Sequence, residues 1–221
     1  MKTHHKIAVI GGGGRTGKYL VNQLLDRGFQ IKLLLRNPKI SKQIIPLQNP
    51  AIQVVEGDVL NYEAVCSLIE GCDAVISTVG QRKDEPLVAS QATANILKAM
   101  SESANREVIA KRYILVAGIN VDTPIDKKGA ETLAATEWMK SNFPVIHEDR
   151  QKAYEILQES DAAWILVRFP FIVFTEDQSE VGVSLEDSPG QKVSVASIAG
   201  FLIDQLSDEN YIRKAPFIAN V

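Results

Sequence analysis

Residues 6–18 of this 221-residue chain read KIAVIGGGGRTGK, a short apolar run that ends in glycines. The apolar part has the length of one buried strand, and a helical pattern follows the glycines. Two registers of a dinucleotide-binding loop fit the glycines, one on Gly12, Gly14 and Gly17 and the other on Gly11, Gly14 and Gly17. The stretch therefore predicts a strand, a tight loop and a helix in direct succession.

The loop has the chemistry that a pyrophosphate requires. Glycines lack a Cβ atom, so the backbone can turn tightly and approach the phosphates. The start of the following helix adds unpaired N–H groups and a partial positive charge. We expect the whole loop to bind a dinucleotide through Gly11, Gly12, Gly13, Gly14, Arg15, Thr16 and Gly17.

Short apolar runs alternate with helical patterns along the rest of the chain. The pattern predicts strands at 6–10, 30–35, 52–56, 73–78, 112–117, 163–168 and 215–219, and helices at 15–27, 62–70, 87–102, 147–159 and 194–206. This alternation favours an α/β fold with a doubly wound parallel sheet, the Rossmann fold. A ligand would then bind at the carboxyl ends of the strands.

Length and composition fit one soluble domain over residues 1–221, with 45% hydrophobic and 23% charged residues. Two insertions interrupt the alternation. Residues 120–143 add a loop and an extra helix, and residues 170–193 are rich in Asp, Glu, Ser and Gly and read as irregular. Both follow strand ends, so both are expected beside the crevice, where long loops often bind ligands.

Composition also argues against several classes of partner. The net charge is −3, from 24 basic and 27 acidic residues, which gives no basic surplus for nucleic acid or an anionic membrane. No apolar stretch has the length of a membrane span or of a signal-peptide core, so we expect a cytoplasmic protein.

Cys66 and Cys72 lack metal-ligand spacing, so no metal is expected. Composition does not determine the oligomeric state.

The end of the second predicted strand indicates which cofactor is preferred. NAD-binding sites usually carry an acidic residue there, which binds the ribose 2′-hydroxyl. This chain has Arg36 at that place, and its guanidinium suits a 2′-phosphate, with Arg15 as a second contact. We therefore expect NADP(H) to be preferred and NAD(H) to be possible. The alternative is a solvated arginine at a strand end.

At this point the chain resembles a known family. The loop 11–17, the run 36–38 (RNP), the runs 56–60 (EGDVL) and 73–80 (DAVISTVG), and the later runs 164–170 and 193–199 are similar to NAD(P)H-binding, atypical short-chain dehydrogenases/reductases. That group includes the NmrA-like proteins and biliverdin-IXβ/flavin reductase.

The resemblance implies roles for residues beyond the glycine-rich loop. It places Asp58 and Val59 at the adenine, and it places four residues near the adenine-side ribose and the pyrophosphate: Ser77, Thr78, Val79 and Gly80. Asp58 has an alternative role as a turn or helix cap before residues 61–63.

The catalytic residues of the wider superfamily are missing. Its typical members use a serine and a Tyr-x-x-x-Lys pair, but none of the five tyrosines here has a lysine four residues later. The fifth strand ends in Ala117 and Gly118, where the family often has serine. His147 and Gln151 fall near the tyrosine and lysine places, so His147 is a candidate general acid. The alternative is a histidine at a helix start without a chemical role.

Three functions remain after these observations. The first is an NADPH-dependent oxidoreductase that reduces a small planar acceptor, such as a flavin, quinone or tetrapyrrole, by direct hydride transfer. The second is a non-catalytic NADP(H)-binding redox sensor that signals to a protein partner. The third is an enzyme like a nucleotide-sugar epimerase or dehydratase, which the short length and the missing Tyr-x-x-x-Lys pair disfavour.

Overall fold

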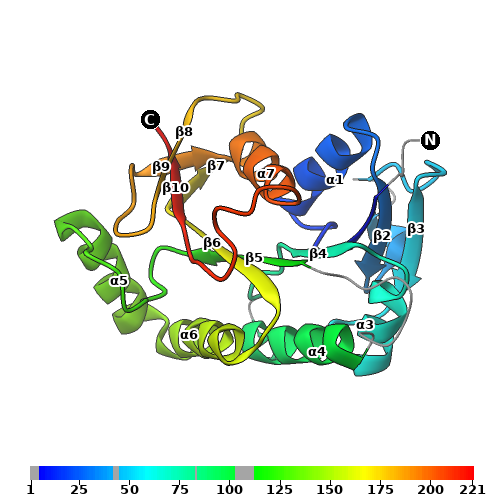
Figure 1. Cartoon of the computed structure of the whole chain (residues 1–221), viewed down its shortest axis with the longest axis horizontal. Coiled ribbons are helices and arrows are strands. Elements are labelled where there is room, and N and C mark those ends of the chain that lie inside the picture. The colour runs from blue at the N-terminus through cyan, green and yellow to red at the C-terminus, as the bar shows by residue number, and fades with distance from the viewer. Residues whose placement is uncertain (1–4, 42–44, 83, 103–111) are drawn as a thin grey trace.

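The computed structural model describes residues 5–41, 45–82, 84–102 and 112–221. Within them an eight-stranded sheet has the order β3-β2-β1-β4-β5-β6-β10-β8 (Figure 1). All neighbouring strands in it are parallel except β8, which runs antiparallel to β10. Its strands are β1 (Lys6–Ile10), β2 (Gln30–Leu35), β3 (Ile52–Glu56), β4 (Ala74–Ser77), β5 (Arg112–Gly118), β6 (Ala163–Phe169), β8 (Val181–Ser184) and β10 (Phe217–Asn220).

The strand order confirms the doubly wound α/β fold. From β1 the chain builds outward through β2 and β3, and then returns to the other side of β1 to add β4, β5 and β6. The order therefore reverses between β1 and β4. A crevice opens at the carboxyl ends of the strands at such a reversal, because the two connections leave in opposite directions.

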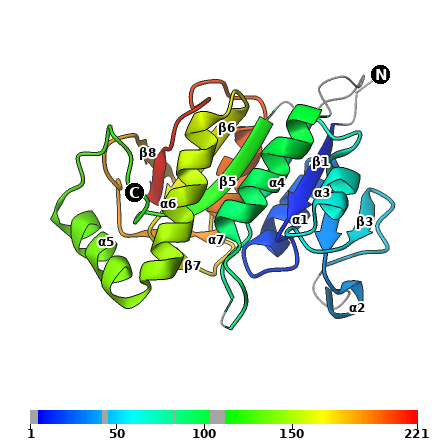
Figure 2. The same ribbon diagram turned by 90° about the horizontal axis from the view of Figure 1, so that it is seen from below.

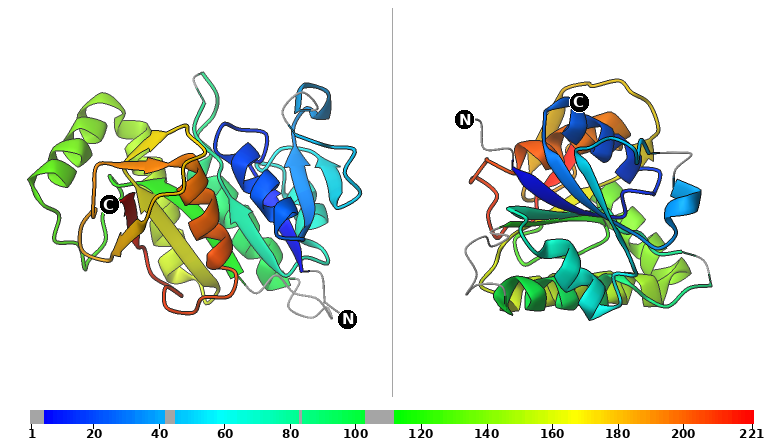
Figure 3. Two further views of the ribbon diagram at one scale, coloured as in Figure 1. Left: turned by 90° about the horizontal axis from the view of Figure 1, so that it is seen from above. Right: turned by 90° about the vertical axis from the view of Figure 1, so that its right-hand side faces the viewer.

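Helices cover both faces of the sheet. On one face lie α1 (Gly17–Asp26) and α7 (Val195–Asp204), and on the other lie α3 (Tyr62–Ile69), α4 (Ala89–Glu102) and α6 (Pro144–Glu159) (Figures 2 and 3). Each face has its own apolar core. Leu20, Leu24 and Ile198 belong to the first, and Val65, Ile96 and Leu157 belong to the second.

Two buried charges fix the ends of helices on the second face. Lys32 in β2 donates from Nζ to the carbonyl oxygens of Ser67 and Glu70, at 2.7 and 2.8 Å, at the C-terminus of α3. Asp149 in α6 accepts hydrogen bonds from the backbone N–H groups of Ala89 and Ser90, at 2.8 and 3.1 Å. Each charge is opposite in sign to the helix end that it contacts, which is the stabilising arrangement.

Most predicted elements agree with the structure to within about three residues at their ends. The helix predicted from residue 147 begins earlier, at Pro144, because proline suits the first turn of a helix. The short helix α2 (Pro38–Ser41) was not predicted. The expectation of an irregular segment at 170–193 was wrong, since this segment contains β7 (Phe171–Val173), β8 and the start of β9 (Lys192–Ser194). Strands β7 and β9 form a separate parallel pair.

Residues 120–143 contain α5 (Ala130–Asn142), which lies beside α6 at the end of the molecule (Figure 2). Buried charges anchor the loop before it. The fully buried Arg168 in β6 donates from Nη1 to Asp126 at 2.8 Å and to the carbonyl oxygen of Val121 at 2.9 Å. Lys128 Nζ lies 2.6 Å from Asp122 Oδ1. The insertion is therefore a fixed part of the molecule's edge.

Candidate dinucleotide site

A cavity of about 560 Å³ lies at the carboxyl ends of the central strands, a volume typical of a ligand pocket. Residues at or after the ends of β1, β2, β3 and β4 line it, together with one residue in β7 and one just after it. Of the predicted site residues, the cavity is lined by Gly11, Gly13, Gly14, Arg15, Thr16, Arg36, Asp58, Val59, Thr78, Val79 and Gly80.

Gly11, Gly12 and Gly17 are required by the chain's own packing. Gly11 has a φ of +81°, and a Cβ atom there would lie 2.8 Å from the backbone of Thr78. A Cβ atom on Gly12 would collide with Leu33, and one on Gly17 would collide with the carbonyl oxygen of Gly11. Gly12 and Gly17 do not line the cavity, so their contribution to the site is the shape of the loop.

Gly14 differs from these three glycines because a Cβ atom there would make one tight contact and no severe collision. A Cβ atom there would meet only the carbonyl oxygen of Gly11, at 3.1 Å, and the residue lines the cavity. The backbone N–H of Gly14 donates to the same oxygen at 2.9 Å, which closes the turn. The loop therefore presents bare backbone to the cavity, and this is the surface that a pyrophosphate requires.

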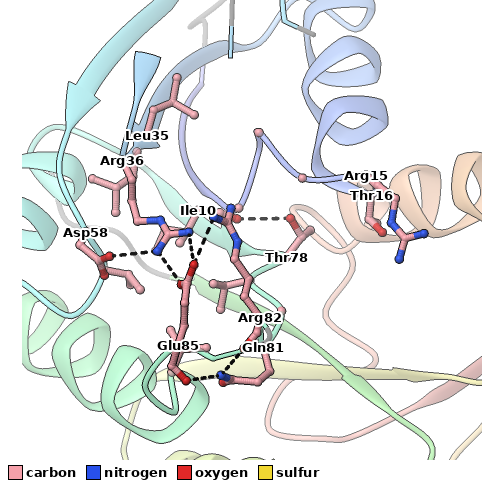
Figure 4. A pocket seen from close by; sticks show the side chains of 18 of the residues that line it. Ile10, Arg15, Thr16, Leu35, Arg36, Asp58, Thr78, Gln81, Arg82 and Glu85 are labelled. Carbon is pink, nitrogen blue, oxygen red and sulfur yellow. Dashed lines mark hydrogen bonds and ion pairs between the residues drawn. The ribbon is translucent and has the colours of Figure 1, made fainter. Parts of the chain in front are cut away.

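Four charged side chains meet at the end of the cavity beside β2 (Figure 4). Arg36 donates to both carboxylate oxygens of Glu85, at 2.6 and 3.2 Å. Its Nη1 atom also lies 3.7 Å from Asp58 Oδ2. Arg82 approaches the same carboxylate from the other side, with Nη1 3.7 Å from Glu85 Oε1. Two guanidinium groups therefore share one carboxylate at the end of β2.

The structure separates the two roles considered for Asp58. Asp58 Oδ1 accepts from the backbone N–H of Leu60 at 2.9 Å and so stabilises the turn after β3. The cap of α3 is Asn61, whose side chain accepts from the backbone N–H of Ala64 at 3.2 Å. Val59 beside it is buried, and its carbonyl oxygen accepts from Asn95 at 2.9 Å. Asp58 is a turn cap that lines the cavity.

Ser77, by contrast, belongs to the core. It is fully buried in β4 and does not line the cavity. Its hydroxyl faces Tyr113, whose pKa is raised by burial and lowered in part by the hydroxyl groups of Thr93 and Ser77. Thr78, the next residue, is at the cavity, where its backbone N–H donates to the carbonyl oxygen of Ile10 at 2.9 Å.

The other end of the cavity is largely apolar. Ile172 in β7 and the nearby Phe174 line it, and the Arg15 guanidinium lies over the Phe174 ring, 4.6 Å from its centroid. Figure 4 shows Arg15 and Arg36 at opposite sides of the cavity. The structure thus does not place Arg15 and Arg36 around one phosphate. Arg82, which the sequence analysis did not consider, is the cation next to Arg36.

His147 lies outside the cavity lining and is 8% exposed. Its Nδ1 atom is 3.1 Å from the amide nitrogen of Asn120. An amide nitrogen can only donate, so Nδ1 accepts and carries no proton. Burial lowers the pKa of His147, and the positive charge of Lys140 lowers it further. At neutral pH the imidazole is therefore neutral and bonded to the loop that follows β5.

Gln151, at the place of the superfamily's lysine, also forms hydrogen bonds to the loop that follows β5. Its side chain accepts from the backbone N–H of Asp122 at 2.9 Å and donates to the carbonyl oxygen of Asp122 at 3.0 Å. His147 and Gln151, at the places of the superfamily's tyrosine and lysine, therefore both stabilise the loop 120–122.

Five residues of the cavity lining were not predicted from the sequence: Gln81, Arg82 and Glu85 at the β2 end, and Ile172 and Phe174 at the apolar end. A signal for the first group was present, because the charged run at 82–85 lies just after a predicted strand end at residue 78. Ile172 and Phe174 had no comparable signal.

The described residues contain no cluster of three potential metal ligands. No described helix is long and apolar enough to cross a membrane.

A family model described as NAD(P)H-binding matches residues 11–209, which is most of the chain and includes every cavity-lining residue except Ile10. The chain belongs to this NAD(P)H-binding family. The predicted resemblance to the atypical short-chain dehydrogenases/reductases is thereby confirmed.

Curated relatives of this family member match only in part. Cinnamoyl-CoA reductase 2 of Arabidopsis thaliana is 30% identical over 117 residues, 51% of this chain and 35% of the relative. An isoflavone reductase homologue of Nicotiana tabacum is 37% identical over 105 residues, 45% of this chain and 32% of the relative. The chain thus spans about a third of the length of the curated relatives that it matches.

Solved structures match nearly the whole chain at low identity. An anaerobillin reductase from Escherichia coli O157:H7 has a TM-score of 0.79 at 14% identity, over 97% of each chain. A short-chain dehydrogenase/reductase from Veillonella parvula in complex with NADP has a TM-score of 0.77 at 18% identity, over 98% of this chain and 94% of that one. These matches establish the shared fold.

Proposed function

We propose that this family member is an NADPH-dependent reductase of a small planar acceptor, such as a flavin, quinone or tetrapyrrole. The observation that carries the proposal is the continuity of the cavity. One space joins the arginines at the end of β2, the bare backbone of the glycine-rich loop, and the apolar end at Ile172 and Phe174. A dinucleotide and a flat acceptor require these three surfaces in this order.

The cofactor's adenosine half would occupy the end at β2 and β3. Asp58 and Val59 would face the adenine, and the 2′-phosphate would lie against Arg36, which supports a preference for NADP(H) with NAD(H) still possible. Gly11, Gly13 and Gly14 would hold the pyrophosphate by their backbone. Arg15 and Thr16, which directly follow Gly14, continue this wall, and four residues after β4 would close it: Thr78, Val79, Gly80 and Gln81.

The proposed reaction needs positioning more than acid–base catalysis. A bound reduced nicotinamide would supply a hydride, and the single proton that completes the reduction would come from solvent. A planar acceptor with an activated ring position accepts hydride directly, so a tyrosine donor is not required. No tyrosine is among the described residues that line the cavity. Phe174 would stack on the acceptor and hold it against the nicotinamide.

The decisive experiment measures NADPH and NADH oxidation by the purified chain with a panel of flavins, quinones and linear tetrapyrroles. Turnover with at least one planar acceptor, faster with NADPH, is the expected result. Turnover of simple aldehydes or ketones in preference to every planar acceptor would contradict the proposal. Dinucleotide binding should be measured in parallel by calorimetry, so that cofactor binding and turnover are scored separately.

A redox sensor is the second candidate, and one observation favours it. Trp138 in α5 and Phe143 are 57% and 43% exposed, and their rings pack edge to face at 5.5 Å. Val145 beside them is 57% exposed as well. Exposed apolar groups of this kind suit a protein partner. Tight NADP(H) binding without turnover across the whole panel would select this candidate.

A further inference from the structure

We propose that Glu85 competes, within the chain, with the 2′-phosphate of the cofactor and so limits the preference for NADPH over NADH that Arg36 would otherwise give. This inference rests on the proposed binding of the cofactor's adenosine half at Arg36. Glu85 holds the place between Arg36 and Arg82 that an incoming phosphate would take. The 2′-phosphate would bind only after the carboxylate leaves.

The geometry at Arg36 is that of an anion site already filled by the protein. Arg36 makes a two-pronged contact with Glu85, from Nη1 and Nη2 to the two carboxylate oxygens. A guanidinium binds phosphate with the same fork. The same N–H groups cannot serve both anions at once. Two anions held side by side there would also repel each other.

The position of Glu85 is fixed by the turn that carries it. Gln81 donates from Nε2 to the carbonyl oxygens of Arg82, Glu85 and Pro86, at 3.0, 3.0 and 3.2 Å. The two N–H groups of this amide share the three acceptors and so hold together the backbone on both sides of Glu85. Asp84, next to Glu85, has a φ of +59°, which is unusual for a residue other than glycine. A side chain on the cavity wall thus holds Glu85 toward Arg36.

Arg82 is a second cation beside the position that the Glu85 carboxylate occupies and that the 2′-phosphate would take. Its Nη1 atom is 3.7 Å from Glu85 Oε1, and the residue lines the cavity. Once the Glu85 side chain rotates toward solvent, Arg36 and Arg82 would both face the phosphate. Asp58, 3.7 Å from Arg36, stays in place as the turn cap after β3. NADH lacks the phosphate, so it gains nothing from the removal of Glu85.

The test measures the affinities of NADP⁺ and NAD⁺ by calorimetry for the wild-type chain, Glu85→Gln and Arg82→Ala. Glu85→Gln should bind NADP⁺ about fivefold to tenfold more tightly, which is the scale of losing one half-exposed ion pair and one like charge. Its affinity for NAD⁺ should change less than twofold. Arg82→Ala should weaken NADP⁺ about tenfold and leave NAD⁺ unchanged. The gain from Glu85→Gln should shrink at high salt, because salt screens exposed charges.

Glu209→Gln is the matched control, because it removes the same charge from an exposed position. It lies near the amino ends of the strands, away from the cavity, where the carbonyl oxygen of the neighbouring Asp208 accepts from Arg112 at the start of β5. This variant should change neither affinity.

Two results would overturn the inference. If Glu85→Gln leaves NADP⁺ affinity unchanged, Glu85 does not compete with the phosphate. If the same variant loses NAD⁺ affinity instead, Glu85 accepts the ribose 2′-hydroxyl and favours NADH. A wild-type chain that binds neither nucleotide would refute the proposed function itself, and that result is distinct from both.

Discussion

The two ends of the cavity differ in chemistry, although one loop connects them. At the β2 end, Arg36, Arg82, Asp58 and Glu85 form a cluster of alternating charges. At the β7 end, the wall is formed by Ile172 and Phe174, and its nearest cation, Arg15, is stacked on the Phe174 ring. One end is therefore suited to recognise a charged group, and the other to hold a flat apolar one. This contrast implies that binding and turnover depend on separate residues.

The largest effect is expected where the two ends join. Gly14→Val would place a branched side chain in the cavity at the proposed pyrophosphate position. Affinity for both dinucleotides should fall about 100-fold or more, where each tenfold corresponds to about 1.4 kcal/mol. Calorimetry measures the loss, and circular dichroism checks the fold. Gly200→Ala in α7 is the control, since its Cβ atom would make ordinary contacts at 3.6 Å. Undiminished binding by a folded Gly14→Val variant would show that the site lies elsewhere.

The next effect belongs to the charged end alone. Arg36→Ala should weaken NADPH by about 10–100-fold and NADH far less, because a charge-assisted contact to the 2′-phosphate contributes about 1.5–3 kcal/mol. Arg27→Ala offers a matched control: Arg27 also pairs with a carboxylate at 2.6 Å and is 39% exposed, against 38% for Arg36. Equal losses of NADPH and NADH would assign Arg36 a structural role instead.

The apolar end should respond in the opposite way. Phe174→Ala should raise the KM for a planar acceptor by about tenfold through the loss of stacking, and change NADPH affinity little. Phe174 is 40% exposed, so the variant should fold. Phe143→Ala, with 43% exposure and no place in the cavity lining, is the control for steady-state kinetics. A change in NADPH affinity as large as that in KM would remove the distinction between the two ends.

His147 should have the smallest effect on turnover. His147→Asn keeps an acceptor near the place of Nδ1 for the Asn120 amide, and kcat should change less than about threefold. A proton-donating His147 would instead make the loss about 10²–10⁴-fold. Steady-state kinetics with the active acceptor decides between the two, and a large loss would restore His147 as the general acid.

The same histidine should contribute to acid sensitivity. Burial, Lys140 and Lys128 lower the pKa of His147 and outweigh the opposing effects of Asp122 and Glu148. The unfolded chain then takes up a proton more readily than the folded one. The wild-type chain should lose stability as the pH falls from about 6.5 toward the lower pKa of the folded state, by at most about 1.4 kcal/mol per pH unit. Urea unfolding of His147→Asn should lack this component; an equal pH dependence in both proteins would contradict it.

The sequence predicted well what local chemistry determines. Strand β1 and the loop after it follow from adjacent residues, so their position could be read directly. The pairing of Arg36 with Glu85 joins residues 49 positions apart, and that of His147 with Asn120 joins residues 27 apart. Such contacts depend on how the helices pack on the sheet. Phe174 was missed for a similar reason, since β7 finds its partner β9 only in the folded chain.

The buried charges at Lys32 and Asp149 have a consequence for the precision of the site. Apolar burial attracts a helix to a sheet without direction, whereas hydrogen bonds to a charge also fix the helix along its axis. Lys32 donates hydrogen bonds to carbonyl groups at the C-terminus of α3, and Asp149 accepts hydrogen bonds from the first N–H groups of α4. A slide of either helix would break these bonds inside the protein, where unpaired charge is costly. The axial register of α3 and α4 is thus locked, and with it the spacing of the two cavity walls that precede them, Asp58 to Leu60 and Glu85 to Val88.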